Sequence, residues 1–307
     1  METPVWKTDE RNSVFHSRNR ILDHVTGILI ALVGTLLLAF AVWKTRRVRV
    51  ETGLVLEVDT FSPEWDDLLE RRFAVYRHLP DELRDRLRDR VRAFVNEKQF
   101  EACGGLETIT EEMRVLVAAQ AALLLVGRPK DRLYPRLHSV LMYPGAFRDR
   151  GKRVFGPDDD DDHERDIRLG ESWNTGSVIL AWDSVQRGAA RDDDGMNVVL
   201  HEFAHQLDQA DGSADGVPAL GDDEAYFDWE KIMKREYETL VGEAEDPRAD
   251  PLLDPYGATN PAEFFAVATE TFFELSEDLR DEHPELFREL RDYYGVDPTE
   301  WKNRNRA

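Results

Sequence analysis

GMNVVLHEFAHQLDQADG, residues 195–212, contains the pattern His-Glu-x-x-His within an apolar stretch that predicts a mostly buried helix. His201 and His205 are four positions apart, so their rings lie one helical turn apart on the same face and can reach a single metal ion. Glu202 lies beside that ion, where its carboxylate can accept a proton from a bound water molecule. The segment therefore predicts a zinc-dependent hydrolytic site with Glu202 as the catalytic base.

A catalytic zinc ion usually has three protein ligands and a water molecule, so a third ligand must lie elsewhere in the sequence. In one class of zinc peptidases this ligand is a histidine ten residues after the first, reached through a glycine turn. Asp211 stands at the histidine position here, and Asp208 stands at the position of the glycine. Asp211 is therefore one candidate ligand, although an aspartate at position 208 suits a sharp left-handed turn poorly.

In a second class the third ligand is a glutamate on a later helix. Pro261 is suited to the first turn of a helix, and Glu263 then lies in that turn. Glu270 lies seven residues further on and shares its face, while Glu274 is less central. Spacing alone does not separate Glu263 from Glu270, so both remain candidate ligands at this point.

The composition limits the chemistry of the site and of its partners. Acidic residues outnumber basic residues 62 to 40 in 307 residues, which gives a formal net charge of −22. This charge argues against nucleic acid as the main partner, because phosphate binding needs a basic face. Cys103 is the only cysteine, so an intrachain disulfide and a cysteine-based zinc site are both excluded.

Residues 25–43 carry no charge and are apolar on all sides, which predicts one N-terminal transmembrane helix. A cleavable signal peptide is the alternative, because residues 39–41 resemble a cleavage site. The cationic residues at 44–49 directly follow the apolar run and favour a cytoplasmic C-terminal part. We therefore expect a single-pass protein of the inner membrane with its catalytic domain in the cytoplasm.

The remaining sequence predicts one domain that combines helices with a few strands. Expected helices begin near Pro80, Thr110, Pro261 and Pro284, and expected strands cover 138–144 and 176–182. The aspartates at 158–162 lack the spacing of a calcium loop and are expected in a solvated loop. The expected division of the chain is a tail (1–24), a membrane helix (25–43), a linker (44–65) and a metallopeptidase domain (66–307).

The fold class that this pattern favours is α+β, with a small mixed sheet flanked by helices and the His-Glu-x-x-His helix beneath the sheet. The strand at 176–182 is also a candidate edge of the cleft, along which an extended peptide could add as a further strand.

Several motifs together resemble the Mlc titration factor A family of zinc-dependent peptidases. They are HEFAHQLD (201–208), ADGVP (214–218) and DPYGATNPAEFFAVATETFF (254–273), with SVLMYPGAF (139–147) and GESWNTGSVILAWDSV (170–185) preceding them in the family's order. That family is similar in turn to the gluzincin catalytic domain of anthrax lethal factor. The resemblance covers about residues 80–301 and implies a zincin-like fold.

The resemblance also implies roles for individual residues. It implies one zinc ion per chain, bound by His201, His205 and Glu263, with Glu202 as the base. Tyr256 matches a tyrosine that supports the oxyanion of the tetrahedral intermediate. Glu270 and Asp208 then become candidates for holding a histidine ring in place.

The implied activity is peptide-bond hydrolysis of aminopeptidase type, with a peptide or protein as substrate. The family is named for binding a transcriptional repressor, which is the second kind of partner that the resemblance implies. The alternative function is that of a membrane-anchored, regulator-binding protein with a non-catalytic zinc site. A closed structural zinc site takes four protein ligands, whereas the sequence offers three good ones.

Overall fold

The computed structural model describes residues 60–128, 131–145, 148–149, 152–153, 176–210 and 212–303. All of them belong to one unit, Glu57–Ala307. The expected tail (1–24), the expected membrane helix (25–43), most of the linker (44–65), the aspartates at 158–162 and Asp211 lie outside the described residues. Within the described part of the chain, no helix is both long and apolar enough to cross a membrane.

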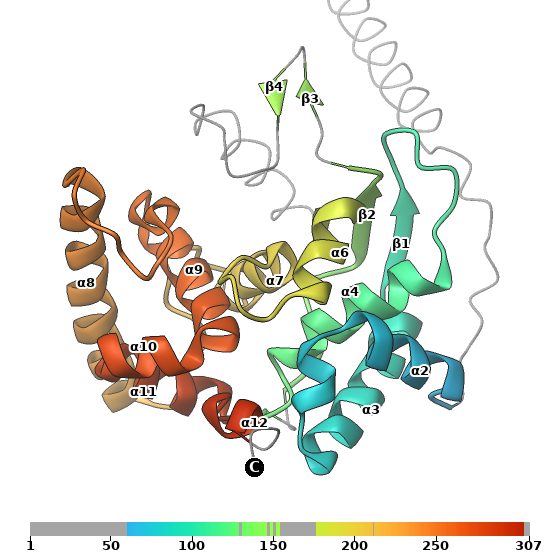
Figure 1. Ribbon diagram of the computed structural model, residues 1–307, viewed down its shortest axis with the longest axis horizontal. Coiled ribbons are helices and arrows are strands. Elements are labelled where there is room, and N and C mark those ends of the chain that lie inside the picture. Colours follow the sequence, from blue (N-terminus) through green and yellow to red (C-terminus); the bar gives the residue numbers. More distant parts are fainter. Residues whose placement is uncertain are drawn as a thin grey trace, which may run out of the picture. The chain divides into compact units, whose positions relative to one another are not determined.

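Among the described residues, the main sheet has three strands in the order β1–β2–β5, of which Figure 1 labels β1 and β2. These are β1 (Gln99–Ala102), β2 (Ser139–Tyr143) and β5 (Ser177–Ala181), and both of their pairings are parallel. The expected strands near 138–144 and 176–182 are therefore present, but the expectation of a mixed sheet is wrong for this sheet. Its strands are joined by long crossovers, one of which contains α4, and such crossovers return the chain in the same direction. A separate antiparallel pair joins β3 (Arg148–Asp149) to β4 (Lys152–Arg153).

Helix α4 (Glu111–Leu123) lies within the hydrophobic core, to which buried residues of all three strands also belong. Thr110 caps its first turn by accepting a hydrogen bond from the Met113 backbone N–H. Every residue from 115 to 123 is buried, so the expectation of a buried core helix here is confirmed. Helix α3 (Asp81–Glu97), which was also expected, packs on α4 and buries an apolar stripe of Leu87, Val91 and Phe94. The core thus supports the sheet and the helices around it.

Two further helices, α7 (Val198–Asp208) and α9 (Pro261–Glu274), pack against each other (Figure 1). They run antiparallel, because the start of α7 bonds to the end of α9 and the end of α7 lies at the start of α9. Each begins directly after an asparagine that caps it. The Asn197 side chain accepts hydrogen bonds from the first turn of α7, and Asn260 does the same for α9. Pro261 occupies the first turn of α9, as expected. These caps fix where each helix starts and therefore which residues face the other helix.

The remaining elements surround this helix pair and the core. They are α2 (Pro63–Arg72), η1 (Val75–His78), α6 (Trp182–Ala190), α8 (Asp223–Glu245), η2 (Pro255–Ala258), α10 (Ser276–Glu282), α11 (Pro284–Tyr294) and α12 (Thr299–Asn303). The long helix α8 was not among the helices expected from the sequence. Its signals were an aspartate cap at Asp222 and a stripe that includes Trp229 and Leu240, both buried.

The turn that follows α4 contacts the end of α11 at two glycines, Gly127 and Gly295. Gly295 ends α11 in the left-handed conformation, with φ of 66°. A Cβ atom at Gly127 would lie 2.3 Å from the Tyr294 carbonyl oxygen and 2.6 Å from that of Gly295. The two backbone segments can therefore lie this close only because residue 127 has no side chain.

We predict that Gly127→Ala lowers the free energy of unfolding by about 1–3 kcal/mol, because the added methyl group overpacks a contact made of backbone atoms. Gly242→Ala, in the exposed part of α8 where a Cβ atom meets nothing within 4 Å, is the matched control. It should raise stability by up to about 1 kcal/mol, since alanine favours a helix over glycine. Urea unfolding of the full-length chain measures both changes. A Gly127→Ala variant as stable as the wild type would contradict the close approach.

Candidate metal centre

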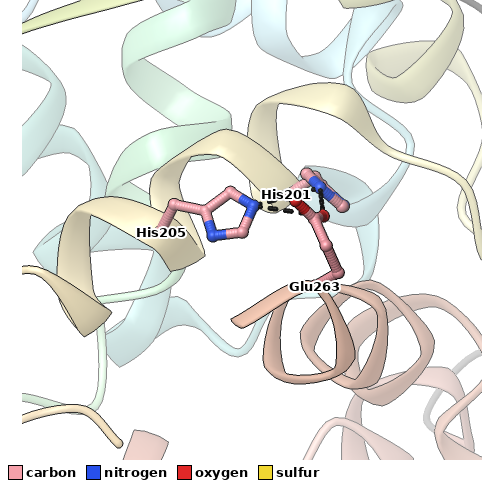
Figure 2. A group of neighbouring side chains, drawn as sticks. All are labelled: His201, His205 and Glu263. Carbon is pink, nitrogen blue, oxygen red and sulfur yellow. Dashed lines mark hydrogen bonds and ion pairs between the residues drawn. The ribbon is translucent and has the colours of Figure 1, made fainter. Parts of the chain in front are cut away.

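Helices α7 and α9 bring together three side chains that could hold a metal ion (Figure 2). His201 and His205 come from successive turns of α7, and Glu263 comes from the first turn of α9. The Nε2 atoms of the two histidines lie 3.3 Å apart. The Glu263 Oε2 atom lies 2.9 Å from Nε2 of His201 and 3.4 Å from Nε2 of His205. Two imidazole nitrogens and one carboxylate oxygen therefore converge on one point.

This donor set fits a small divalent metal ion. A tetrahedral ion with bonds of about 2.0–2.1 Å places its ligand atoms roughly 3.3 Å from one another. The three distances in this cluster, 2.9, 3.3 and 3.4 Å, lie close to that separation. The nitrogen and oxygen donors also suit an ion of borderline softness. The three side chains can accordingly hold a metal ion with little movement.

The triad of His201, His205 and Glu263 is buried, which makes an uncompensated charge there costly. His201 is 8% exposed, Glu263 is 1% exposed and His205 is fully buried. Burial by itself would raise the pKa of Glu263, but hydrogen bonds with His201 and His205 lower that pKa below its ordinary value. Burial would lower the pKa of His201, yet Glu270 and Glu263 outweigh it and raise that pKa. The site therefore favours a positive charge beside its carboxylates, which a metal ion can supply.

Glu270 supports the triad from the side of His201 that faces away from the other ligands. Its Oε1 atom lies 2.7 Å from His201 Nδ1, and its Oε2 atom accepts a hydrogen bond from the Asn197 backbone N–H. Glu263 is the glutamate next to both Nε2 atoms, so the geometry separates the two candidates that spacing left open. A carboxylate on the outer nitrogen fixes the tautomer and orientation of a metal-binding imidazole.

Glu274 holds the beginning of α7 rather than a histidine. Its Oε1 atom accepts a hydrogen bond from the Asn197 side chain (3.1 Å), and its Oε2 atom accepts one from the Met196 backbone N–H (3.0 Å). Burial raises the pKa of Glu274 to about 9, although the bond from Asn197 opposes this. This role of Glu274 and Asn197 was not predicted from the sequence. An asparagine directly before an apolar helical stretch was the signal that could have indicated the cap.

Three further residues that were expected at the site, Glu202, Tyr256 and Asp208, are among the described residues. Glu202 is 2% exposed and directly follows His201 on α7. The Tyr256 ring, on η2, is centred 6.0 Å from the ring of His201. Asp208 is fully buried at the end of α7, where it accepts a hydrogen bond from the Gly216 backbone N–H (3.1 Å). Burial raises the pKa of Asp208 to about 6, although the bond from Gly216 opposes it.

Comparison with known proteins gives one family and several relatives. The family described as glucose-regulated metallo-peptidase M90 matches residues 42–295. The uncharacterized protein slr2042 of Synechocystis sp. is 42% identical over 238 residues, which cover 77% of this chain and 85% of that protein. Mlc titration factor A of Escherichia fergusonii is 29% identical over 252 residues, which cover 77% of this chain and 87% of that protein. Mlc titration factor A of Cronobacter sakazakii is 30% identical over 232 residues, which cover 72% of this chain and 82% of that protein.

We predict that Glu263→Gln removes bound metal, whereas Glu270→Gln weakens metal binding by about 10- to 100-fold without abolishing it. The reason is that Glu263 lies beside both Nε2 atoms, while Glu270 contacts only the outer nitrogen of His201. Elemental analysis after dialysis, followed by chelator competition, measures the two effects. Glu282→Gln, at an exposed carboxylate of α10, serves as the control. Unchanged affinity in Glu263→Gln would exclude this glutamate as a ligand.

Proposed function

The chain belongs to the glucose-regulated metallo-peptidase M90 family, and from this membership and the geometry of the triad we propose that it is a zinc-dependent peptidase. The observation that carries the proposal is the separation of the three ligand atoms, 2.9–3.4 Å, which suits a tetrahedral ion. His201, His205 and Glu263 would hold one zinc ion per chain. A fourth position would then be open for water and substrate.

Glu202 is the proposed catalytic base. When bound, zinc makes a water molecule acidic near neutral pH and polarises the scissile carbonyl group. Glu202 accepts a proton as the water oxygen attacks the carbonyl carbon, and it later passes that proton to the leaving amine nitrogen. Burial at 2% exposure keeps this carboxylate out of bulk solvent, and its place after His201 keeps it beside the metal ligands.

Tyr256 is the proposed donor to the oxyanion. The phenol hydroxyl donates a hydrogen bond to the carbonyl oxygen as negative charge develops on it. The ring lies beside His201, and the backbone of its turn is fixed by the Asp254 side chain, which accepts a hydrogen bond from the Tyr256 backbone N–H (2.8 Å). The turn η2 also packs against α9, the helix that carries Glu263. These contacts support a rigid position for the tyrosine next to the triad.

The proposed substrate is a peptide or protein that lies in extended form along β5, with cleavage of aminopeptidase type. Among the described strands, β5 is at one edge of the main sheet. Val178 and Leu180 of this strand are buried, while Ser177 and Ile179 are partly exposed. An added extended chain could pair with such an edge through backbone hydrogen bonds. Helix α6 follows β5 directly and α7 packs against both, which connects this edge with the metal centre.

A role in regulation is proposed as a second function, because curated relatives carry the name Mlc titration factor A. The partner would be a transcriptional repressor. Such a role is compatible with catalysis, although it also fits a regulator-binding protein with a non-catalytic zinc site. Among the described residues three ligands converge, one fewer than a closed structural zinc site requires, and this favours the catalytic function. We further propose that residues 25–43 anchor the protein in the inner membrane with its catalytic domain in the cytoplasm.

We predict that Glu202→Gln lowers kcat by roughly 10²–10⁴-fold on aminoacyl and peptidyl chromogenic amides, because glutamine cannot accept the proton of the attacking water. The amide has nearly the shape of the carboxylate, so about one zinc ion per chain should remain bound. Turnover and zinc content are measured on the same sample of full-length protein. Near-normal turnover with bound zinc would exclude Glu202 as the base.

We predict that Tyr256→Phe lowers kcat by about 10²–10³-fold with little change in KM, because it removes a hydrogen bond that forms only as the oxyanion develops. Zinc affinity should stay at the wild-type value, since the tyrosine is not one of the three converging ligands. Steady-state kinetics with chelator competition separates the two quantities. A variant that changes KM alone would assign Tyr256 to substrate binding instead.

A further inference from the structure

The connection between α7 and α8 passes between the end of α7 and the beginning of α9. Gly216 in this connection contacts both helices, and its backbone makes two hydrogen bonds. The N–H group donates to Oδ2 of Asp208, at 3.1 Å, and the carbonyl oxygen accepts from the indole Nε1–H of Trp229, at 3.0 Å. Asp208 is fully buried and Trp229 is 1% exposed, so both bonds lie in the interior. This turn is therefore held by α7 on one side and by α8 on the other.

Gly216 also touches the first turn of α9. A Cβ atom at this position would lie 2.4 Å from the Pro261 carbonyl oxygen and 2.8 Å from its carbonyl carbon. The residue adopts φ of +78°, in the left-handed region that favours glycine. Both the space and the backbone conformation therefore require glycine. Any side chain here would push against the backbone of α9, because no flexible side chain stands in between.

These contacts connect the two helices that carry the proposed metal ligands. Asp208 lies three residues after His205 on α7, and Pro261 lies two residues before Glu263 on α9. At the opposite end of the antiparallel pair, Glu270 and Glu274 hold the beginning of α7. The two helices are thus joined at both ends of the site. Of these two connections, the contact at Gly216 is the one nearer to His205 and Glu263.

We propose that Asp208, Gly216 and Trp229 form a positioning element that sets the location of Glu263 relative to His205 and thereby the affinity for the metal ion. This inference rests on the metal site of the proposed function. None of the three residues is a ligand or touches the reacting atoms. They act through the first turn of α9, where a shift of a few tenths of an ångström changes a ligand distance directly. Partners outside the immediate ligands are known to tune metal affinity by about 10- to 100-fold.

The test compares Gly216→Ala with Gly127→Ala in the full-length chain. Both substitutions push a methyl group against a backbone carbonyl oxygen, at 2.4 Å and 2.3 Å respectively. Gly127 contacts the end of α11 instead of the helices that carry the ligands. Zinc affinity is measured by chelator competition, and urea unfolding of the metal-free protein measures the loss of stability. We expect about 10- to 100-fold weaker zinc binding in Gly216→Ala and wild-type affinity in Gly127→Ala.

A second pair of variants separates positioning from general destabilisation. Asp208→Asn keeps an oxygen that can accept the Gly216 hydrogen bond, whereas Asp208→Ala removes it. We expect Asp208→Asn to keep the zinc affinity within a few-fold of the wild-type value. Asp208→Ala should weaken zinc binding about as much as Gly216→Ala does. In the cobalt-substituted proteins, the visible absorption band should change in Asp208→Ala and Gly216→Ala only, because that band reports the arrangement of the ligands.

Two results would overturn the inference. One is wild-type zinc affinity in Gly216→Ala. The other is an equal loss of affinity in Gly216→Ala and Gly127→Ala, which would mean that the effect follows stability alone. Peptide hydrolysis by the wild type is scored separately. A wild-type chain that binds zinc and cleaves no peptide would count against the peptidase proposal, while the affinities would still decide the role of Gly216.

Discussion

The antiparallel packing of α7 on α9 is the interaction on which the site depends. Helix α7 supplies two histidines, and α9 supplies Glu263 to their Nε2 atoms and Glu270 to the outer nitrogen of His201. The helices must hold a fixed register along their axes for these contacts to form together. That register is set by the asparagine caps, by Glu274 at one end of the pair and by the Gly216 turn at the other.

Such packing places three glutamates of α9 in the interior, and each is compensated differently. Glu263 lies between two histidines, which lower its pKa. Burial raises the pKa of Glu270, against the opposing effect of His201. Burial also raises the pKa of Glu274, to about 9, against the opposing hydrogen bond from the Asn197 side chain. The interior therefore holds three acidic side chains because each of them is paired with groups of α7 or of the two residues before that helix.

Local sequence signals were sufficient for the elements that carry the site, but not for their arrangement. His201 and His205 fix one face of α7, and Pro261 marks the start of α9. However, Glu263 and Glu270 share a face of α9, so only the register against α7 distinguishes them, and a register between distant segments has no local signal. The parallel sheet was missed for the same reason, since β1 is short and its partner strand lies beyond α4.

Helix α8, which was not predicted from the sequence, contacts both the turn at Gly216 and the turn η2. Trp229 binds the Gly216 carbonyl, while the Tyr237 hydroxyl donates a hydrogen bond to the Ala258 carbonyl in η2, at 3.2 Å. Leu240 packs against Gly257, the residue after Tyr256. One helix without a metal ligand therefore supports both the turn beside Glu263 and the turn that carries the proposed oxyanion donor. Because one helix contacts both turns, a displacement of α8 would alter the proposed metal binding and the proposed oxyanion stabilisation together.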